Sequence, residues 1–382
     1  MAPPDIAMAD NGDVAFVEHG PATQCGAEDG VIATGSIVNL ASHTTSTVHE
    51  TIGLNYGVVI VKANGRRSTI RRIPPLTFPR VLEIDFSITG LRLADDGTPF
   101  ITLAEGAGTT REAEWVFSWS AAAWREQIME LPIRYGGPLN RRVDAVETPS
   151  RYSVVGDYRE ATQFSYEYHD RDPTYDMDEA GIVEDGKVAP LGFGDVTSMR
   201  GRYSAGYVAP YGWCAQTGAP TAVLWDGTKK KKLGPGVAFG VDADGDVVGD
   251  DRPPVNGQSN EQTGTDCIDG AHPTLWRHGK VVQLSKLRGS ALAIRNGTIV
   301  GTVGVIAVCC VGPENKFASL TGGNAFVARA RDEEHTFRYL DELARGDWTI
   351  TSAFAIAASG RILAVGHPSE SQVSSILILD PR

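Results

Sequence analysis

Short runs of alternating apolar and polar residues, each interrupted by a turn dipeptide, occupy most of the chain. In AFGVDADGDVVGD (238–250), apolar residues flank Asp244-Gly245, a dipeptide that favours a tight hairpin because glycine tolerates positive φ. Such alternation predicts pairs of antiparallel strands. The pattern recurs around Asn11-Gly12, Asp96-Gly97, Asn296-Gly297 and Ser359-Gly360, and more weakly near residue 150 and around Gly201.

A second hairpin follows each of these first hairpins. The clearest are TAVLWDGTKKKKL (221–233) and TLWRHGKVVQL (274–284), and the KKKK run at 229–232 is expected to lie in the tight turn. The repeating unit is therefore strand, tight turn, strand, variable loop, strand, tight turn, strand. The remaining second hairpins are expected in 57–70, 115–128, 180–191, 325–340 and 374–380.

Seven such units predict an all-β, seven-bladed β-propeller with four-stranded antiparallel blades. One such sheet cannot bury both faces, whereas a radial arrangement buries them against each other. The later turns recur every 44 to 63 residues or so, a period typical of blades. Six blades is the alternative if the first unit is irregular. We expect one domain over 1–382, with blades at 5–75, 82–131, 141–192, 194–234, 235–286, 289–345 and 350–382.

The last unit ends after its third strand, which leaves the ring closure open. Either the seventh blade has three strands or the N-terminus contributes the fourth, for which residues 1–4 are short. The only helical pattern, at 121–131, is modest and is interpreted as a fourth strand with a helical turn. No apolar run approaches the length of a transmembrane helix.

The charge and the cysteines bear on partners and location. A net charge of −12 argues against nucleic acid as a partner. All five cysteines lie in predicted loops, which favours disulfides in an oxidising compartment. Cys214 with Cys267 is the first candidate pair, and Cys267 with Cys309 or Cys310 competes. MAPPDIAMADNGD has no leader pattern. We therefore expect an exported protein whose leader is outside this sequence, with a cytoplasmic location as the alternative.

Five segments resemble the bacterial HAF-repeat propellers, whose pattern is A-x-x-I-N-x-x-G-x-V-V-G followed by H-A-F-x-W-x-x-G. The resemblance is good over 196–380 and faint in the first 140 residues. It implies the propeller fold and an extracytoplasmic location, and it carries over no catalytic residues. His272 and His278 belong to the repeat and are expected to be structural. The segments are AFGVDADGDVVG (238–249), ALAIRNGTIVG (291–301), AHPTLWRHG (271–279), TAVLWDG (221–227) and NAFVARA (324–330).

Nearly all variation in length falls between the second and third strands of the units. In a propeller these segments leave from one face, so we expect binding on that face. Neutral lengthening is the alternative, because long surface loops cost little. The segments are 18–56, 104–114, 157–179, 207–220, 250–273, 302–324 and 367–373.

The aromatic and charged residues of these segments are the candidates for ligand binding. Aromatic rings stack on sugars or other flat apolar surfaces, although a long loop also needs such residues for its own packing. The acids of 170–179 match no calcium loop, and the Asp242 segment lacks the spacing of an EF-hand, so we expect no cofactor, with calcium the only alternative. The predicted ligand-binding residues are Asp157, Tyr166, Tyr168, His169, Arg171, Tyr207, Tyr211, Trp213 and Asp250.

Residues that directly follow the second strands are expected at the rim of the channel. Blades 7 and 1 are neighbours, which would bring His367 near His19. With Tyr158 and Arg252 these residues could perform acid–base catalysis, as in a polysaccharide lyase, although a channel rim is polar in any propeller. The sequence thus predicts a monomeric propeller that binds a glycan or other small molecule and neither nucleic acid nor membrane. An enzyme at the channel mouth and a protein-interaction scaffold are the alternatives.

Overall fold

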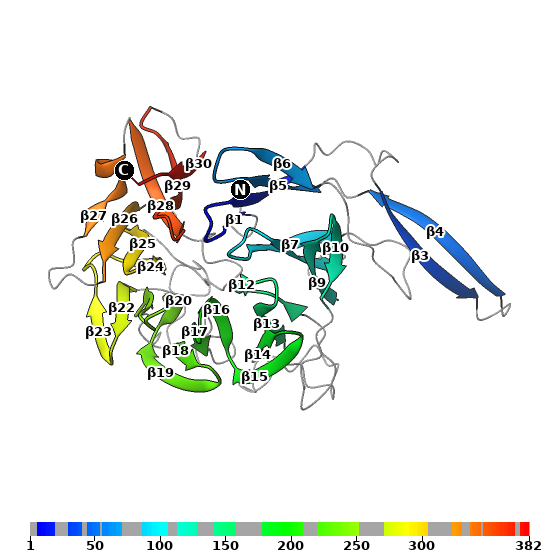
Figure 1. Ribbon diagram of the computed structural model, residues 1–382, viewed down its shortest axis with the longest axis horizontal. Helices are drawn as coiled ribbons and strands as arrows, with labels where there is room; N and C mark the ends of the chain where they lie inside the picture. Colours follow the sequence, from blue (N-terminus) through cyan, green and yellow to red (C-terminus); the bar gives the residue numbers. More distant parts are fainter. Residues whose placement is uncertain are drawn as a thin grey trace, which may run out of the picture.

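Seven small antiparallel sheets form a ring in the computed structural model of this chain (Figure 1). The protein is therefore an all-β, seven-bladed β-propeller, as the repeat pattern predicted. The structure describes residues 6–19, 30–39, 44–53, 56–70, 86–105, 113–127, 141–157, 178–208, 220–251, 271–304, 323–330, 337–344, 347–370 and 375–381.

Each blade runs outward from the channel, with its first strand innermost. Blade 1 consists of β1 (Ile6–Met8), β2 (Val14–His19), β5 (Tyr56–Val61) and β6 (Arg67–Ile70), and blade 2 of β7 (Phe86–Leu93), β8 (Pro99–Glu105), β9 (Ala113–Ser120) and β10 (Ala123–Glu126). Blade 3 consists of β12 (Val146–Thr148), β13 (Arg151–Asp157), β14 (Asp178–Glu184) and β15 (Lys187–Phe193), and β11 (Arg141–Arg142) also pairs with β13. Blade 4 consists of β16 (Asp195–Arg200), β17 (Tyr203–Val208), β18 (Thr221–Asp226) and β19 (Lys229–Pro235).

The last three blades follow the same order, except that blade 7 has three described strands. Blade 5 consists of β20 (Val237–Val241), β21 (Val247–Asp250), β22 (Pro273–Arg277) and β23 (Lys280–Gln283). Blade 6 consists of β24 (Gly289–Arg295), β25 (Thr298–Val303), β26 (Asn324–Arg329) and β27 (Arg338–Tyr339), followed by the short helix α1 (Leu340–Leu343). Blade 7 consists of β28 (Trp348–Ile356), β29 (Ile362–Pro368) and β30 (Ser375–Leu379).

The first hairpin of blade 5 shows how turn chemistry sets the strand pairing. Gly245 has a φ of 81°, and its N–H donates to the carbonyl of Asp242 at 3.1 Å. The Asp242 carboxylate accepts the backbone N–H groups of Asp244 and Asp246 at 3.0 and 3.1 Å. This carboxylate therefore closes its own turn, in agreement with the hairpin interpretation of this acidic segment.

A bulge in the innermost strand explains the glycine of the repeated V-V-G triplet. The register between β20 and β21 skips Phe239, and a Cβ on Gly249 would lie 1.9 Å from the carbonyl oxygen of Val237. A side chain cannot enter this space, because the neighbouring atoms are backbone. A Cβ on Gly206, Gly301 or Gly366 would likewise lie 1.7, 2.2 and 2.5 Å from a backbone oxygen of its own blade.

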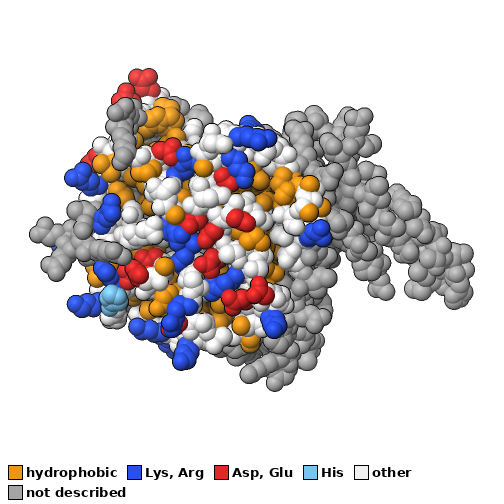
Figure 2. Space-filling model, viewed as in Figure 1, with side chains coloured by type: hydrophobic (Ala, Val, Ile, Leu, Met, Phe, Trp, Pro, Cys, Tyr) orange, Lys and Arg blue, Asp and Glu red, His pale blue; other side chains and the backbone are white. Residues whose placement is uncertain are grey.

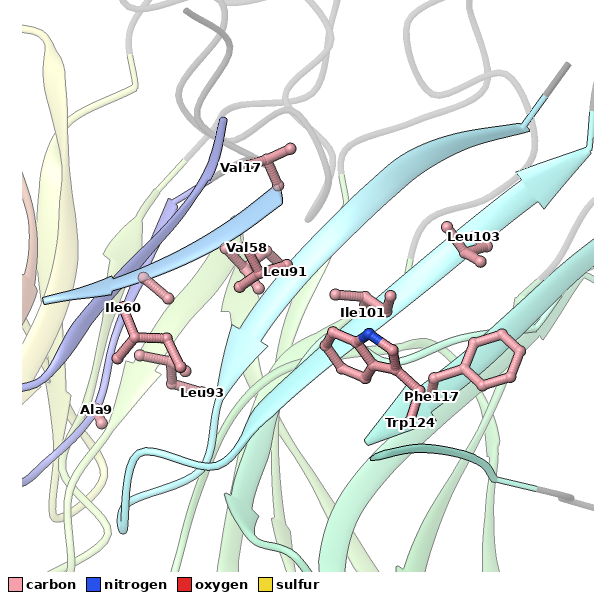
Figure 3. Packing of buried hydrophobic residues seen from close by; sticks show 11 residues of the cluster. Ala9, Val17, Val58, Ile60, Leu91, Leu93, Ile101, Leu103, Phe117 and Trp124 are labelled. Atoms are coloured by element: carbon pink, nitrogen blue, oxygen red, sulfur yellow. The ribbon is translucent and has the colours of Figure 1, made fainter. Parts of the chain in front are cut away.

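The hydrophobic core lies between neighbouring blades. In Figure 3, Val58 and Ile60 of blade 1 lie beside Leu91 and Leu93 of blade 2, and all four side chains are buried. Ile101 from the same cluster is buried farther out. Because the strands alternate, each sheet presents one apolar row to each neighbour, and the ring buries both faces of its sheets.

Direct contact between blades 7 and 1 closes the ring. Innermost strands β28 and β1 touch, and the N–H of Ala358 donates to the carbonyl of Asp10 at 3.2 Å. The guanidinium of Arg361 also donates to the carbonyls of Gly12 and Ala63 in blade 1. The N-terminal strand is thus the first strand of blade 1, and among the described residues it adds nothing to blade 7.

Three local features complete the comparison with the predicted elements. The prediction for KKKK (229–232) was wrong, because these lysines begin strand β19 and the turn precedes them at Gly227, where φ is 58°. The helical pattern at 121–131 contains β10, which pairs with β9, and no α-helix is found in its described residues. The paired strands β3 (Gly30–Asn39) and β4 (Thr44–Gly53) within 18–56 were not anticipated. Across the described ranges, no helix is long and apolar enough to span a membrane.

Candidate functional site

The two faces of the ring differ in what connects their strands. The first and second strands of each blade, and the third and fourth strands of blades 1 to 5, are joined by tight turns at one face, which we call the turn face. The opposite face, which we call the insertion face, is where all second strands end. The long segments therefore leave from one side, at His19, Glu105, Asp157, Val208, Asp250, Val303 and Pro368.

Charged side chains cross the channel mouth on the turn face. Arg295 of blade 6 donates to the carboxylate of Asp10 of blade 1. Arg200 of blade 4 donates to Asp95 of blade 2, and its guanidinium nitrogen lies 3.8 Å from Asp10. We call these four residues the central ionic network. Figure 2 shows acidic and basic side chains gathered near the middle of this view of the ring.

Backbone hydrogen bonds hold the turns around this network. Asn11 N–H donates to the carbonyl of Asp95 at 3.1 Å, and Asp95 N–H donates to the carbonyl of Glu147 at 2.8 Å. The Glu147 carboxylate then accepts the N–H of Gly201 at 2.6 Å. Turns of blades 1 to 4 are thereby linked in succession, which fixes the positions of the charged side chains.

The central ionic network is balanced in charge and partly removed from water. Its two arginines and two aspartates cancel, and the side chains of Arg295 and Asp10 are only 13% and 15% exposed. Burial raises the pKa of the Asp95 carboxyl above its ordinary value, while Arg200 acts in the opposite direction. An arrangement with no net charge suits closure of the channel better than capture of an ion.

Apolar side chains from the innermost strands meet between several blades. Phe239, Leu292 and Phe354 come from the first strands of blades 5, 6 and 7, and they share one buried cluster with Ile6 of blade 1. Each of the three is the residue that a register shift leaves out of its strand pairing. The bulges thus turn these large side chains toward the centre of the ring, where they exclude water.

Three residues near the ends of second strands hold neighbouring blades together, and two of them, Asp250 and Tyr207, were predicted to bind a ligand. Asp250 is fully buried, and its carboxylate accepts the hydroxyl of Ser290 from blade 6 at 2.7 Å. Thr302 is also fully buried, and its hydroxyl donates to Ser352 of blade 7 at 2.7 Å. Tyr207 is buried in the apolar cluster of the inner strands. Alternation along the strand turns these side chains into blade interfaces, so the prediction that Asp250 and Tyr207 lie on an open ligand-binding surface was wrong.

The histidine pair predicted across the ring closure is described only in part. His367 lies in β29, its backbone pairs with Thr349, and its Nδ1 lies 2.9 Å from the carbonyl oxygen of Pro368. His19 ends β2, but its side chain lies outside the described residues. The blades that carry the two residues do touch. Proximity of the two imidazoles stays a prediction.

The other candidates fall where the structure describes no side chain. Asp157 ends β13, where its backbone pairs with Asp178, but its side chain is not described. The candidate disulfide and the predicted aromatic surface therefore stay predictions. The residues outside the described ranges are Tyr158, Tyr166, Tyr168, His169, Arg171, Tyr211, Trp213, Arg252, Cys214 and Cys267.

An imidazole–carboxylate pair on the insertion face was missed by the sequence analysis. The Asp251 carboxylate accepts the backbone N–H of His272 at 2.7 Å, and the Nδ1 of the same histidine lies 3.3 Å from it. Both side chains are part-exposed, and they stand where the segment 252–270 leaves and rejoins blade 5. Two positions in the sequence could have revealed the pair: Asp251, which directly follows V-V-G-D, and His272, which directly precedes the third strand of the blade. Such a pair can exchange a proton with a bound molecule.

Neither metal ligands among the described residues nor related proteins indicate a function for this chain. Within the described residues, no group of three or more His, Cys, Asp or Glu side chains could hold a metal ion. Comparison with protein-family models and with curated proteins found no match for this chain. The resemblance to HAF-repeat propellers therefore stays a prediction from the repeat pattern.

Proposed function

We propose that this propeller binds a carbohydrate or another small ligand on its insertion face. One contrast carries the proposal: the central ionic network crosses the mouth on the turn face, whereas every long segment leaves from the opposite face. Surface segments held by a rigid scaffold are where binding residues concentrate. The aromatic residues of 158–177 and 209–219 are the groups that would stack on a sugar ring.

Aromatic truncation on the insertion face tests this proposal. The protein is applied to an array of immobilised glycans, and the best ligand is titrated by calorimetry. We expect Tyr168→Ala with Trp213→Ala to lower the affinity at least tenfold, on the order of the loss of one or two stacking contacts. Val281→Ser, on the exposed outer strand of blade 5, serves as the matched control and should bind like the wild type.

Two results would overturn the proposal. One is the absence of binding to any glycan or small ligand by the wild-type protein. The other is a ligand whose affinity falls with substitutions on the turn face, such as Asp96→Ser at an exposed tight turn, but not with the aromatic substitutions. The unfolding midpoint of each variant is measured in parallel, so that loss of binding is separated from loss of folding.

The Asp251–His272 pair favours a second candidate, an enzyme on the same face. A polysaccharide lyase removes the proton beside a uronate carboxyl group, and the electron pair forms a double bond as the glycosidic oxygen leaves. His272 would accept that proton, Asp251 would orient the imidazole, and Arg252, which follows in sequence, would neutralise the carboxylate. Acidic polysaccharides are incubated with the protein, and the ultraviolet absorbance of unsaturated products is followed. A rate equal in the wild type and His272→Gln would exclude this role.

A further inference from the structure

The outer edge of blade 7 differs from that of the other six blades. Strand β30 pairs with β29 on its inner side, and no described residue pairs with its outer side. In each of the other blades a fourth strand covers the corresponding edge. Among the described residues, the backbone N–H and C=O groups along the outer side of β30 therefore have no strand partner.

The sequence of β30 lacks the features that usually protect an edge. Ser-Ile-Leu-Ile-Leu contains neither a charged residue nor proline, and β30 pairs with β29 without a bulge. Ile376 and Ile378 are 36% and 38% exposed, which is unusual for large aliphatic side chains in a strand. An uncharged, regular edge of this kind is a template for strand addition.

An apolar cavity of about 570 Å³ lies beside this edge, between blades 6 and 7. Strand β27 of blade 6 is only two residues long, and the helix α1 that follows it contributes Leu340 and Leu343 to the lining. Leu343 of α1 is 46% exposed at this cavity. Its apolar lining includes Leu340, Leu343, Ala344, Trp348, Ile350, Ile362, Leu377 and Leu379.

The fourth strands of the other blades indicate which segment would fit. Strands β6, β15, β19 and β23 begin with Arg67, Lys187, Lys229 and Lys280. Lys187 pairs with Glu184 and Lys229 with Asp226, so in blades 3 and 4 the first residue of the fourth strand faces an acid at the end of the third. In blades 1 and 5 it faces Val61 and Arg277 instead. Blade 7 presents Asp380 at that end, with its side chain 61% exposed and its carboxylate accepting the Nε–H of Arg361 at 2.6 Å, so an incoming cation would be the second one at this acid.

We propose that blade 7 is completed by an extended segment of a partner polypeptide, which adds to β30 as an antiparallel fourth strand. The segment begins with a lysine or arginine near Asp380 and carries aliphatic residues at alternate positions, which enter the cavity between blades 6 and 7. Main-chain hydrogen bonds to β30 and aliphatic side chains in the cavity together give the recognition. This surface is separate from the proposed ligand site on the insertion face.

A second copy of the chain satisfies these conditions less well. Pairing β30 with its own copy would bring no cation to Asp380, because 374–379 contains none. Two copies would also each carry a net charge of −12, and like charges oppose association. A basic, aliphatic segment of another protein matches both the charge and the cavity.

Peptide binding to the whole protein tests the proposal. The probe is a fluorescent peptide with the sequence of the chain's own fourth strand in blade 5, HGKVVQL (278–284). Fluorescence anisotropy should show saturable binding. We expect at least tenfold weaker binding for a peptide with N-methyl groups at alternate backbone nitrogens on the pairing edge, and weaker binding when its lysine is replaced by glutamate.

Protein variants locate the site. Ile378→Lys and Leu343→Asp change exposed side chains at the cavity and should each lower the affinity at least tenfold. Val281→Lys, on the exposed outer strand of blade 5, should leave it unchanged. The proposal fails if the peptide does not bind, if N-methylation has no effect, or if both cavity variants bind like the wild type. It also fails if sedimentation shows a dimer that Ile378→Lys dissociates and that the peptide does not compete with.

Discussion

Replacement of Gly249 by alanine tests whether the bulged inner strand dictates the glycine of the repeat. The new Cβ would lie 1.9 Å from the carbonyl oxygen of Val237 and 2.9 Å from the Cα of Ala238. A carbon–oxygen contact needs about 3.3 Å or more, so the backbone of β20 would have to move by roughly 1.4 Å. These backbone atoms are packed between two blades, so they cannot move aside as the end of a flexible side chain can.

The expected cost follows from this overlap. Overpacking of a tight interior costs about 1–3 kcal/mol, and each disturbed hydrogen bond between β20 and β21 adds about 1 kcal/mol. We therefore expect the free energy of unfolding to fall by about 3 kcal/mol. For 382 residues the unfolding entropy is about 0.8 kcal/mol per kelvin, so the melting temperature should fall by about 4 °C.

Gly90→Ala is the matched control. Gly90 lies in the first strand of blade 2, and its nearest contact for a new Cβ is Thr102 Oγ1 at 3.4 Å, an ordinary distance. We expect no loss of stability, or a small gain from the lower entropy of the unfolded chain. Both variants are melted in a calorimeter with the wild type. The reasoning is refuted if Gly249→Ala melts within about a degree of the wild type, or if Gly90→Ala falls as far.

Three further changes probe the turn face and the channel. Arg295→Met leaves the part-buried Asp10 carboxylate with only the more distant Arg200, and urea unfolding should show a loss of about 2 kcal/mol. Arg202→Met at an exposed pair should be neutral, and equal effects would contradict the burial argument. Burial raises the pKa of the Asp246 carboxyl, so the folded state binds the carboxyl proton more tightly than the unfolded state does. The stability of the wild type should therefore fall relative to that of Asp246→Asn as the pH rises through the window directly above the ordinary aspartate range. A difference in urea midpoints that stays flat or changes in the opposite direction would refute this prediction. Phe239→Ala should cost about 3–5 kcal/mol, and a near-neutral result would show that the channel is not filled by this ring.

The amino-acid sequence alone determined the blade repeat and most of its strands. Turn dipeptides such as Asn11-Gly12 and Asn296-Gly297, with alternating apolar residues on both sides, are local signals that need no distant partner. They predicted the seven sheets, and the order of strands within each blade followed from the antiparallel connection. The placement of KKKK in a turn failed, because the turn at Gly227 is so short that Lys229 already pairs with Asp226 in the next strand.

Only the tertiary structure decided how side chains at the ends of strands are used. Asp250 looked accessible in sequence, but blade packing buries it against Ser290, forty positions away. The central ionic network joins Arg200 to Asp95 and Arg295 to Asp10, across 105 and 285 positions, and no local pattern marks such pairs. Alternation of apolar and polar residues along the chain determines which side chains share a face of a strand. Closure of the ring determines which neighbouring blade packs against that face.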